Sequence, residues 1–559
     1  MSAILDARPT LARRALPALL FALLVVGVYS PTLFFRRNFA GRDLLVYNLP
    51  MEKTIHDAYS RGALPVWMPE VSGGRPLLPN PNAGALYPLR FLLSVFSFPL
   101  AMRLFPVIHW AAAGIGMMLF LRATAASRAA GWVGAVTYAF SGVAVAEVFF
   151  PHIQPGMTLL PWILWAVARP TPGRGGKLLL LSTFFALIML AGDVFTIGTA
   201  ILCAGLWTLA ERGRSEWRRE LLLLALGVAL AALIALPQIL ATLLWVPDTN
   251  RSILGMRLQE TFFYSISPFR LLEFFVPYLF GSTWTLDGWT VWGRPVFRFK
   301  DMGIFSSLYC GALSVMAVLT SWRWRAPAAR FARILLVSAL FAAVLPSLLP
   351  ARWGRLPSPL PLRFPEKFAV AIVLALAVLA ALAVDRFRST GWSPRWALVG
   401  GGFLALAAGL AAVFPDRAGR LAITIIGSPP WPAGVPKTSI GLHEIAGREL
   451  PSALAEAGLF WIVTVIALDL LVRPGRRGLA VALILLTLVP IAANWRIARS
   501  VREEEMLSPG PFARSIDRRD PAETYRTLGE SLYAEESEIE KRQMAADPEG
   551  VDDSWIFYR

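Results

Sequence analysis

The chain has almost no cysteine and little histidine, which removes several classes of site. Cys203 and Cys310 are the two cysteines among 559 residues, and both fall in apolar runs. A lone thiol in such a run is usually a small packed hydrophobe, so we expect no disulfide and no thiolate metal site. The four histidines form no His-x-x-x-His pair and no Cys-x-x-Cys pair occurs, so we do not expect a dedicated zinc centre. Weak binding of Mg²⁺ or Mn²⁺ by carboxylates is left open.

Charged residues are also scarce for a chain of this length. Asp, Glu, Lys and Arg make up 16% of the residues, hydrophobic residues make up 56%, and the mean hydropathy is +0.55. This composition excludes a soluble protein and indicates a polytopic membrane protein. The net charge of +17 comes from basic residues scattered over the loops between apolar runs. Without a basic domain interleaved with aromatics, we expect anionic lipid as a partner and not nucleic acid.

Apolar runs of bilayer length predict about 13 transmembrane helices. They lie near 15–35, 103–122, 129–150, 155–169, 177–191, 194–210, 220–246, 303–321, 331–349, 366–385, 396–414, 455–473 and 477–497. No small-residue cleavage pattern follows the first run, which we therefore interpret as a retained anchor. The chain divides into a membrane domain, 1–497, and a small soluble tail, 498–559, in which acidic residues outnumber basic ones.

The distribution of Lys and Arg predicts the orientation of these spans. Arg8, Arg13 and Arg14 precede the first span, and alternate short loops after it are rich in arginine. The N-terminus is therefore expected in the cytoplasm. The loops at 36–101, 247–302, 350–365 and 415–454 and the C-terminal tail are then extracytoplasmic. Arg36 and Arg37 run against this rule but are outnumbered.

The long first outer loop, 36–101, contains the most informative sequence. It begins with Gly41-Arg42-Asp43-Leu44-Leu45-Val46-Tyr47 and continues through Pro, Gly, Trp and Asn residues to Leu86-Tyr87-Pro88-Leu89. Asp43 follows the first span closely, so its carboxylate should lie at the bilayer surface, within reach of a lipid-anchored substrate. The proline and glycine residues exclude a membrane-spanning helix here, and the aromatic residues argue against a flexible linker. We therefore expect a structured loop.

Together with five further motifs, this loop resembles the YfhO-like bacterial membrane proteins of the GT-C glycosyltransferase superfamily. The resemblance covers residues 10 to 500 approximately. The motifs are Pro151-His152 with Leu160-Pro161-Trp162, Ala191-Gly192-Asp193, Ala235-Leu236-Pro237-Gln238, Ser267-Pro268-Phe269-Arg270 with Pro277-Tyr278-Leu279-Phe280-Gly281, and Arg363-Phe364-Pro365-Glu366-Lys367-Phe368. That family carries a catalytic acidic residue in its first extracytoplasmic loop. The resemblance implies a bacterial inner-membrane enzyme that moves a sugar from a polyprenyl-phosphate donor to a cell-envelope glycan, polymer or lipid.

Asp43 is the expected catalytic base or metal ligand under this resemblance. The alternative interpretation is an interfacial carboxylate paired with Arg42 or a neighbouring arginine. Arg42 itself would either steer a phosphate or lie among lipid headgroups.

Three further candidates for substrate binding lie at predicted outer ends of spans. Glu147 and His152 flank the end of the third span, and His152 would either assist proton transfer or bond to backbone. Asp193 separates two short apolar halves, as residues lining a cavity often do, but it also suits the N-cap of the helix that follows.

Arg363, Glu366 and Lys367 form a compact box before the tenth span. Pro365 suits a first helical turn, which would aim free amides and two cations toward the outer surface as a clamp for a lipid phosphate. The alternative is interfacial snorkelling of the cations, with Glu366 at a helix N-terminus. Gln238 and Arg270 are weaker candidates of the same kind.

The sequence thus predicts an all-α polytopic enzyme with a GT-C-like architecture. Two other functions stay open: a transporter or flippase for a lipid-linked saccharide, since broken helices and interfacial charges suit it, and a non-catalytic scaffold for envelope assembly. The sugar, the acceptor and the oligomeric state are not predicted.

Overall fold

The computed structural model describes most of the chain. Its described residues are 11–69, 74–169, 173–211, 216–249, 252–253, 255–281, 292–293, 296, 303–358, 363–391, 393–426, 442–498 and 500–503. The tail beyond 503 and the N-terminal residues 1–10, with Arg8, lie outside this part of the chain.

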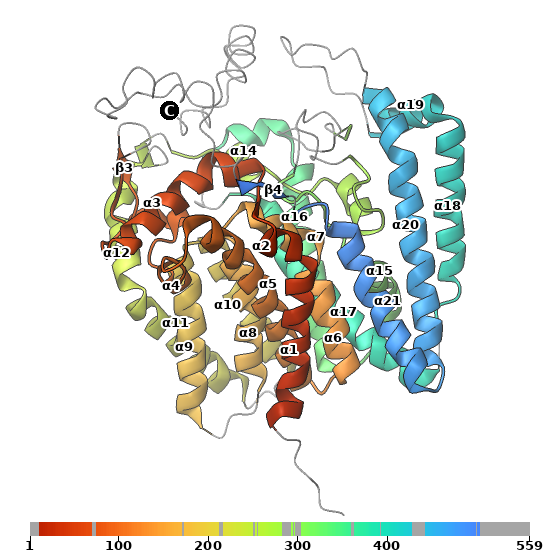
Figure 1. The fold of residues 1–559 in the computed structure, drawn as a ribbon, viewed down its shortest axis with the longest axis horizontal. Coiled ribbons are helices and arrows are strands. Elements are labelled where there is room, and N and C mark those ends of the chain that lie inside the picture. Colours follow the sequence, from red (N-terminus) through yellow and green to blue (C-terminus); the bar gives the residue numbers. More distant parts are fainter. Residues whose placement is uncertain are drawn as a thin grey trace, which may run out of the picture.

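The described chain is mostly helical, which confirms the predicted all-α class (Figure 1). The longer helices are α1 (Leu11–Val28), α3 (Leu49–Ser60), α5 (Phe98–Ala123), α6 (Arg128–Ala139), α8 (Gln154–Ala168), α9 (Arg174–Ala191), α10 (Val194–Glu211), α11 (Trp217–Ile234), α12 (Leu236–Trp245), α15 (Ala312–Ser321), α16 (Pro327–Leu348), α17 (Ala369–Thr390), α18 (Ala397–Val413), α19 (Pro415–Ile426), α20 (Leu442–Val472) and α21 (Arg476–Asn494). Short helices are α2 (Ser30–Phe34), α4 (Pro88–Leu93), α7 (Gly142–Ala146), α14 (Leu258–Thr261), the π-helix η1 (Leu44–Asn48) and the 3₁₀ turns η2 (Pro81–Ala83), η3 (Glu147–Phe149), η4 (Val246–Asp248), η5 (Pro268–Phe274), η7 (Ala351–Arg355) and η8 (Pro365–Phe368).

Each of the 13 predicted spans overlaps a helix, but the count of 13 is not confirmed. Seven helices in the described residues are long and apolar enough to cross a membrane, or up to ten if each of three bent pairs is one span. The predicted spans at 15–35, 155–169 and 303–321 correspond to apolar segments that are too short to count among these helices; α8 has 15 residues and α15 has 10.

The bent pairs show where continuous apolar runs are broken by local chemistry. The bend between α6 and the α7–η3 segment is 44°, between α11 and α12 is 71°, and between α18 and α19 is 114°. Ser141 starts α7 by accepting a bond from the Ala144 amide, and a proline lies at the start of α12 and of α19. Because proline lacks the amide that would continue the preceding helix, the chain turns at these points.

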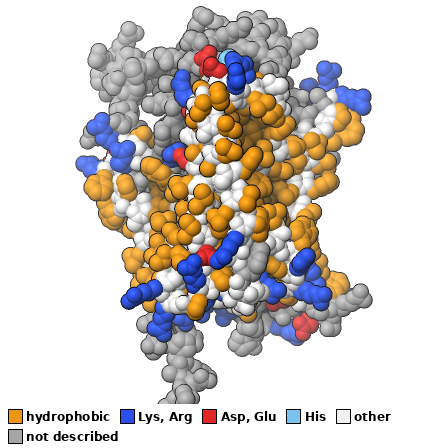
Figure 2. Space-filling view, turned by 90° about the vertical axis from the view of Figure 1, so that its right-hand side faces the viewer, with side chains coloured by type: hydrophobic (Ala, Val, Ile, Leu, Met, Phe, Trp, Pro, Cys, Tyr) orange, Lys and Arg blue, Asp and Glu red, His pale blue; other side chains and the backbone are white. Residues whose placement is uncertain are grey.

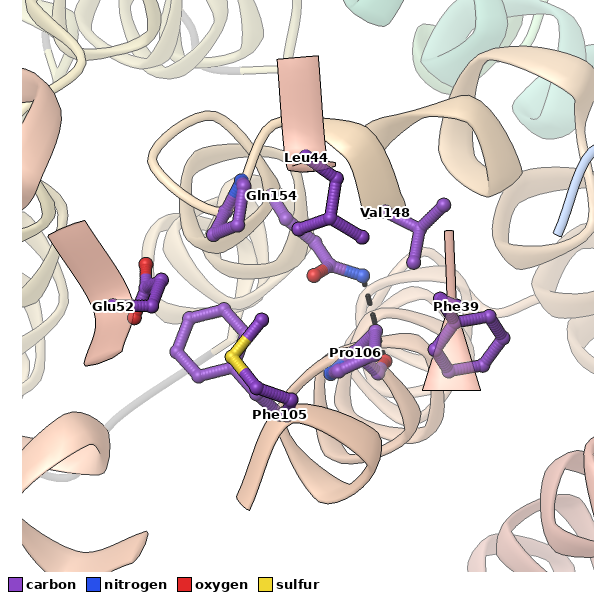
Figure 3. Close-up of a pocket in the computed structure, with 9 residues that line it drawn as sticks. Phe39, Leu44, Glu52, Phe105, Pro106, Val148 and Gln154 are labelled. Carbon is purple, nitrogen blue, oxygen red and sulfur yellow. Dashed lines mark hydrogen bonds between the residues drawn. The ribbon is translucent and has the colours of Figure 1, made fainter. Parts of the chain in front are cut away.

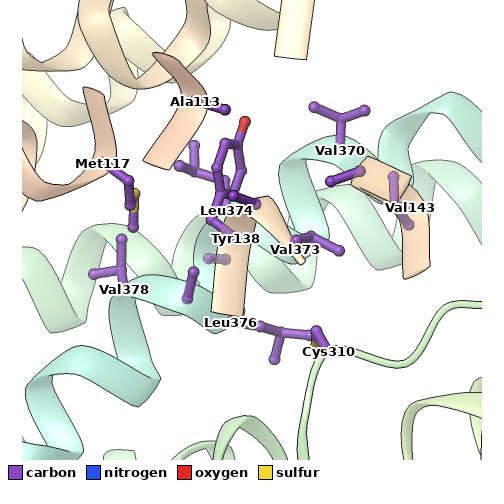
Figure 4. Close-up of a cluster of buried hydrophobic side chains, with 14 of the residues drawn as sticks. Ala113, Met117, Tyr138, Val143, Cys310, Val370, Val373, Leu374, Leu376 and Val378 are labelled. Atoms are coloured by element: carbon purple, nitrogen blue, oxygen red, sulfur yellow. The ribbon is translucent and has the colours of Figure 1, made fainter. Parts of the chain in front are cut away.

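Helix α17 is the centre of the bundle. In its most apolar window 83% of the residues are buried, against 33% in the neighbouring α16. Figure 4 shows Val370, Leu374 and Val378 of this helix among side chains of other segments, including Tyr138 and Cys310. Both cysteines are buried and free.

The outer surface is apolar over its middle. Figure 2 shows hydrophobic side chains across this zone and most Lys and Arg side chains toward the two ends. On α18, Val399 is 75% exposed and Phe403 is 69% exposed, although both lie in a long apolar helix. Large apolar side chains with this exposure need a lipid environment, so the chain is a multi-pass membrane protein.

The first outer loop forms a small folded unit. Strand β2 (Trp67–Met68) pairs with β3 (Arg75–Pro76), and Met51, Ile55 and Leu77 pack together in its own small core. The loop therefore has a defined structure, as its proline, glycine and aromatic residues predict.

A second short sheet joins the two ends of the membrane domain. Strand β1 (Arg37–Phe39) pairs antiparallel with β4 (Ser500–Arg502). The guanidinium of Arg37 donates to Ser500, and Glu503 pairs with Arg103 at 3.2 Å. The residues just before Asp43 and the start of the tail therefore lie on the same end of the bundle, as the predicted topology requires.

Candidate functional site

Asp43 lies on a strained turn between β1 and the π-helix η1. Gly41 has φ +136° and Arg42 has φ +50°, a left-handed conformation that non-glycine residues rarely adopt. The Asn48 amide fixes the turn by donating to the carbonyls of Asp43 and Phe149, each at 3.0 Å. The Asp43 side chain is exposed, and no described residue hydrogen-bonds to its carboxylate or forms an ion pair with it.

Arg42 turns away from its neighbour and binds backbone. Its guanidinium donates to the carbonyl oxygens of Gly303 at 2.9 Å and of Ile304 at 2.5 Å, and it lies over the ring of Phe150. Arg42 therefore forms no ion pair with Asp43 in this conformation, in contrast to the alternative interpretation. Arg42 instead anchors the turn that presents Asp43.

Glu366 holds the same backbone segment from the other side. Its carboxylate accepts from the amides of Ile304 at 2.9 Å and Phe305 at 3.1 Å, and from Arg270 at 2.6 Å. The Glu366 side chain is 1% exposed. With its oxygens occupied by protein donors, Glu366 has a positioning role in this conformation.

We call the chain of contacts formed by Arg42, residues 303–305, Glu366, Arg270 and Glu273 the Arg42 brace. Arg270 also donates to Glu273 at 2.9 Å, and both side chains are 2% exposed. A Cβ at Gly303 would lie 2.2 Å from Nη1 of Arg270, so the close approach requires glycine there. Arg270 has one positive charge against the two carboxylates of Glu273 and Glu366. Burial raises the pKa of Glu273 to about 7, although the charge of Arg270 opposes this rise.

A second group of predicted residues gathers around an ion pair. Lys367 donates to Oδ1 of Asp193 at 2.7 Å, and the two side chains are 12% and 6% exposed. Oδ2 of Asp193 accepts from the Thr196 amide at 3.2 Å, which is the predicted N-cap. Burial alone would raise the pKa of Asp193, but Lys367 outweighs it and holds this pKa below its ordinary value.

Glu147 and His152 border this ion pair. Both lie within electrostatic range of Asp193 and Lys367. Burial lowers the pKa of His152 to about 3, so its ring is neutral at pH 7. Oε1 of Glu147 and Nδ1 of His152 are buried and have no hydrogen-bond partner among the described residues. Such atoms are available to a ligand or to water.

Arg363 lies next to the Arg42 brace, on the segment before α17. Its guanidinium lies 4.8 Å from the ring centroid of Phe364, and Pro365 occupies the first turn of η8 as predicted. Tyr264 lies within electrostatic range of Arg42, Asp43, Glu366 and Arg363. Sequence reasoning missed Tyr264, because a tyrosine in an aromatic outer loop has no distinguishing pattern.

The structure therefore brings the predicted residues together in two adjoining groups. One contains Arg42, Asp43, Arg363 and Glu366 around Tyr264, and the other contains Glu147, His152, Asp193 and Lys367. Glu366 and Lys367 are consecutive and join the groups. Their roles toward a substrate stay predictions.

A small, mainly apolar pocket opens beside the Asp43 turn (Figure 3). Leu44, which follows Asp43, lines it with Phe39, Val148 and Phe105. Gln154 donates to the Pro106 carbonyl at 3.4 Å, while its own oxygen has no hydrogen-bond partner in the described part of the chain. The pocket suits a small apolar group next to the exposed carboxylate.

The first outer loop docks directly on the turn that carries Asp193. A Cβ at Gly192, which has φ +95°, would lie 1.7 Å from the Pro81 carbonyl oxygen. Gln238, one of the weaker candidates, donates to the Leu78 carbonyl at 2.9 Å. Gln238 therefore holds the loop in place.

The described part of the chain offers no preformed metal centre. No group of three or more His, Cys, Asp or Glu side chains among the described residues could hold a metal ion. Asp43 as a metal ligand and the use of Mg²⁺ or Mn²⁺ stay predictions.

Comparison with known proteins gives a distant structural likeness to solved structures. No protein-family model matches the chain, and no curated protein sequence does. A solved cryo-EM structure, a mutant of the arabinofuranosyltransferase AftD from Mycobacteria, matches with 19% identity and a TM-score of 0.38. The match covers 67% of this chain and 26% of that chain, so this protein corresponds to about a quarter of that protein's length.

Proposed function

We propose that this protein is a membrane glycosyltransferase of GT-C type that transfers a sugar from a polyprenyl-phosphate donor to a cell-envelope acceptor. The observation that carries the proposal is the placement of Asp43. Its carboxylate is exposed and unpaired among the described residues, yet Asn48 and Arg42 fix the backbone that presents it. A fixed backbone with an accessible, unpaired carboxylate suits a general base, because the base must be free to accept a proton.

In this proposal Asp43 accepts the proton of an acceptor hydroxyl. The hydroxyl oxygen then bonds to the anomeric carbon of the donor sugar, while the bond from that carbon to the phosphate oxygen breaks and the phosphate leaves with its electron pair. Arg363 neutralises charge on the leaving phosphate. Lys367 completes the proposed clamp from the adjoining group, where Asp193 holds its ammonium in place.

The remaining candidates have supporting roles in the proposal. Glu147 and His152 offer unpartnered atoms to substrate hydroxyls, and Arg42 and Glu366 position Asp43. The proposed topology places this end of the bundle outside the bacterial inner membrane, with the N-terminus in the cytoplasm. The donor then reaches the site laterally, because its lipid stays in the outer leaflet.

Transfer of radiolabelled sugar by the purified protein in detergent tests this function. A panel of polyprenyl-phosphate sugars is offered with envelope glycans and lipids as acceptors, and labelled product is separated from donor. Product in detergent, where no sealed membrane exists, supports a transferase and excludes a pure transporter.

Asp57→Asn is the matched control for Asp43→Asn. Asp57 lies in the same outer loop, on α3, but pairs with Lys53, so it has a structural partner that Asp43 lacks. Loss of transfer in the Asp43 variant alone supports the proposal. Equal transfer by both variants and the wild type removes Asp43 from the reaction, and no transfer by any form shifts the assignment to transport or scaffolding.

A further inference from the structure

Tyr264 lies near both the proposed base and the proposed phosphate clamp, and its ring packs against Phe364, over which Arg363 lies. It lies within electrostatic range of Asp43 and Arg363, and of Arg42 and Glu366 of the brace. Its side chain packs against the core but keeps part of its surface exposed. An aromatic residue this close to both groups can contact a substrate that Asp43 and Arg363 hold.

The backbone of Tyr264 is held in an unusual conformation. Its φ is +55°, which is unfavourable for a bulky side chain and persists only where the surroundings impose it. Here the Glu366 amide donates to the Tyr264 carbonyl at 2.9 Å, and the Phe364 amide donates to the Thr261 carbonyl at 3.2 Å. These two bonds fix segment 261–264 against segment 364–366.

The ring of Tyr264 is fixed as well. Its centroid lies 5.0 Å from that of Phe263 and 5.2 Å from that of Phe364, both in edge-to-face contact. Because Arg363 lies over Phe364, the phenol and the guanidinium belong to one packed group. The phenol is therefore oriented before any ligand arrives.

Resting on the proposed function, we propose that the Tyr264 hydroxyl donates a hydrogen bond to the lipid-linked phosphate and so acts beside Arg363 in recognising the donor. Burial raises the pKa of Tyr264 to about 12, so the phenol keeps its proton at neutral pH and remains a donor. A neutral donor strengthens phosphate binding without placing another cation beside Asp43.

Binding of farnesyl phosphate to the full-length protein in detergent tests this proposal, with farnesol as the ligand that lacks phosphate. The variant is Tyr264→Phe, which removes only the hydroxyl. Tyr278→Phe is the matched control, since Tyr278 lies in the same outer region at φ +54° but its charged neighbours are Arg496, Glu456 and Glu273. Thermal unfolding is measured for each variant.

We expect Tyr264→Phe to bind farnesyl phosphate about 10-fold more weakly, as loss of a hydrogen bond to a charged group predicts. Farnesol binding and the Tyr278→Phe control stay unchanged. Tyr264→His, whose ring retains a donor and tolerates positive φ, recovers part of the affinity. Unchanged affinity for farnesyl phosphate in Tyr264→Phe, an equal loss for farnesol, or a wild type that does not discriminate the two ligands overturns the proposal.

The outcomes separate this inference from the proposed function. Transfer that requires Asp43 but is unaffected by Tyr264→Phe, with unchanged farnesyl phosphate binding, rejects the role of Tyr264 and keeps the transferase. The opposite result is a protein that transfers no sugar to any acceptor but binds farnesyl phosphate more tightly than farnesol only when Tyr264 is present. That result supports the phosphate site and rejects the transferase function.

Discussion

Lys367 and Asp193 form an ion pair across 174 residues of sequence, with 2.7 Å between Nζ and Oδ1. The pair fastens the start of α17, the central helix of the bundle, to the turn between α9 and α10. The same turn carries the first outer loop through Gly192 and Pro81. One buried pair therefore links the helical core, the outer loop and the predicted phosphate clamp.

Removal of one partner of this pair is expected to destabilise the protein more than removal of both. Lys367→Met leaves the Asp193 carboxylate buried without its cation, which costs about 3–5 kcal/mol for a buried pair. The double variant Lys367→Met with Asp193→Asn should recover part of that loss. Thermal unfolding in detergent measures the effect, and equal losses in the single and double variants would contradict a coupled pair.

Gly192→Ala should dislodge the first outer loop. The added Cβ would overlap the Pro81 carbonyl oxygen, and the left-handed φ of +95° is unfavourable for alanine. Gly205→Ala is the control, because Gly205 lies in α10 with no atom within 4 Å of a new Cβ. We expect increased protease cleavage in loop 36–101 for the first variant and none for the second. Equal protection would show that the Gly192 contact does not hold the loop.

Stability should fall as pH rises from about 4.5 to about 7 through the Glu273 carboxyl. Its pKa is raised from 4.5 to about 7, so the folded protein keeps a proton that the unfolded chain releases in this interval. Because the folded state then binds more protons, the free energy of unfolding decreases with pH, by at most on the order of 3 kcal/mol. Above about pH 7 this contribution is lost.

Glu273→Gln should remove that part of the pH dependence. Glu444→Gln is the control, since Glu444 is an exposed carboxylate at the start of α20. Denaturation followed between pH 4.5 and 7.5 gives the slopes for the wild type and both variants. An unaltered slope in Glu273→Gln would mean that Glu273 stays ionised in the folded protein.

Thiol labelling should resolve the orientation in the membrane, because both native cysteines are buried. Leu64 in the first outer loop is 64% exposed, and Trp322 in the arginine-rich loop after α15 is 66% exposed. A membrane-impermeant maleimide should label Leu64→Cys in intact cells and Trp322→Cys only after permeabilisation. The reverse pattern would invert the proposed topology.

Much of the membrane domain could be predicted from the sequence because bilayer-length apolar runs carry a strong signal. The run at 366–385 became the buried helix α17, and the run at 177–191 became α9. The bends could not be predicted with equal success. The run 129–150 reads as one continuous span, yet the Ser141 cap divides it. A single serine cap leaves the mean hydropathy of an apolar run almost unchanged, so the hydropathy does not reveal the break in the helix.

The site was predicted less completely than the fold. Single residues such as Asp43 and Asp193 stand out because charge is scarce in the chain. Their partners depend on contacts between distant segments, so no local pattern reveals that Glu366 binds Arg270 or that Arg42 binds the Gly303 carbonyl. Such contacts are visible only in the folded structure.

The ratio of kcat/KM between the wild type and Asp43→Asn, measured at equal folded yield, tests the central claim most directly. Loss of a general base predicts a fall of about 10²–10⁴-fold in kcat with donor affinity retained. That result would place Asp43 at the centre of sugar transfer. A ratio within about twofold of one, in a preparation whose wild type is active, would contradict the account and remove Asp43 from the reaction.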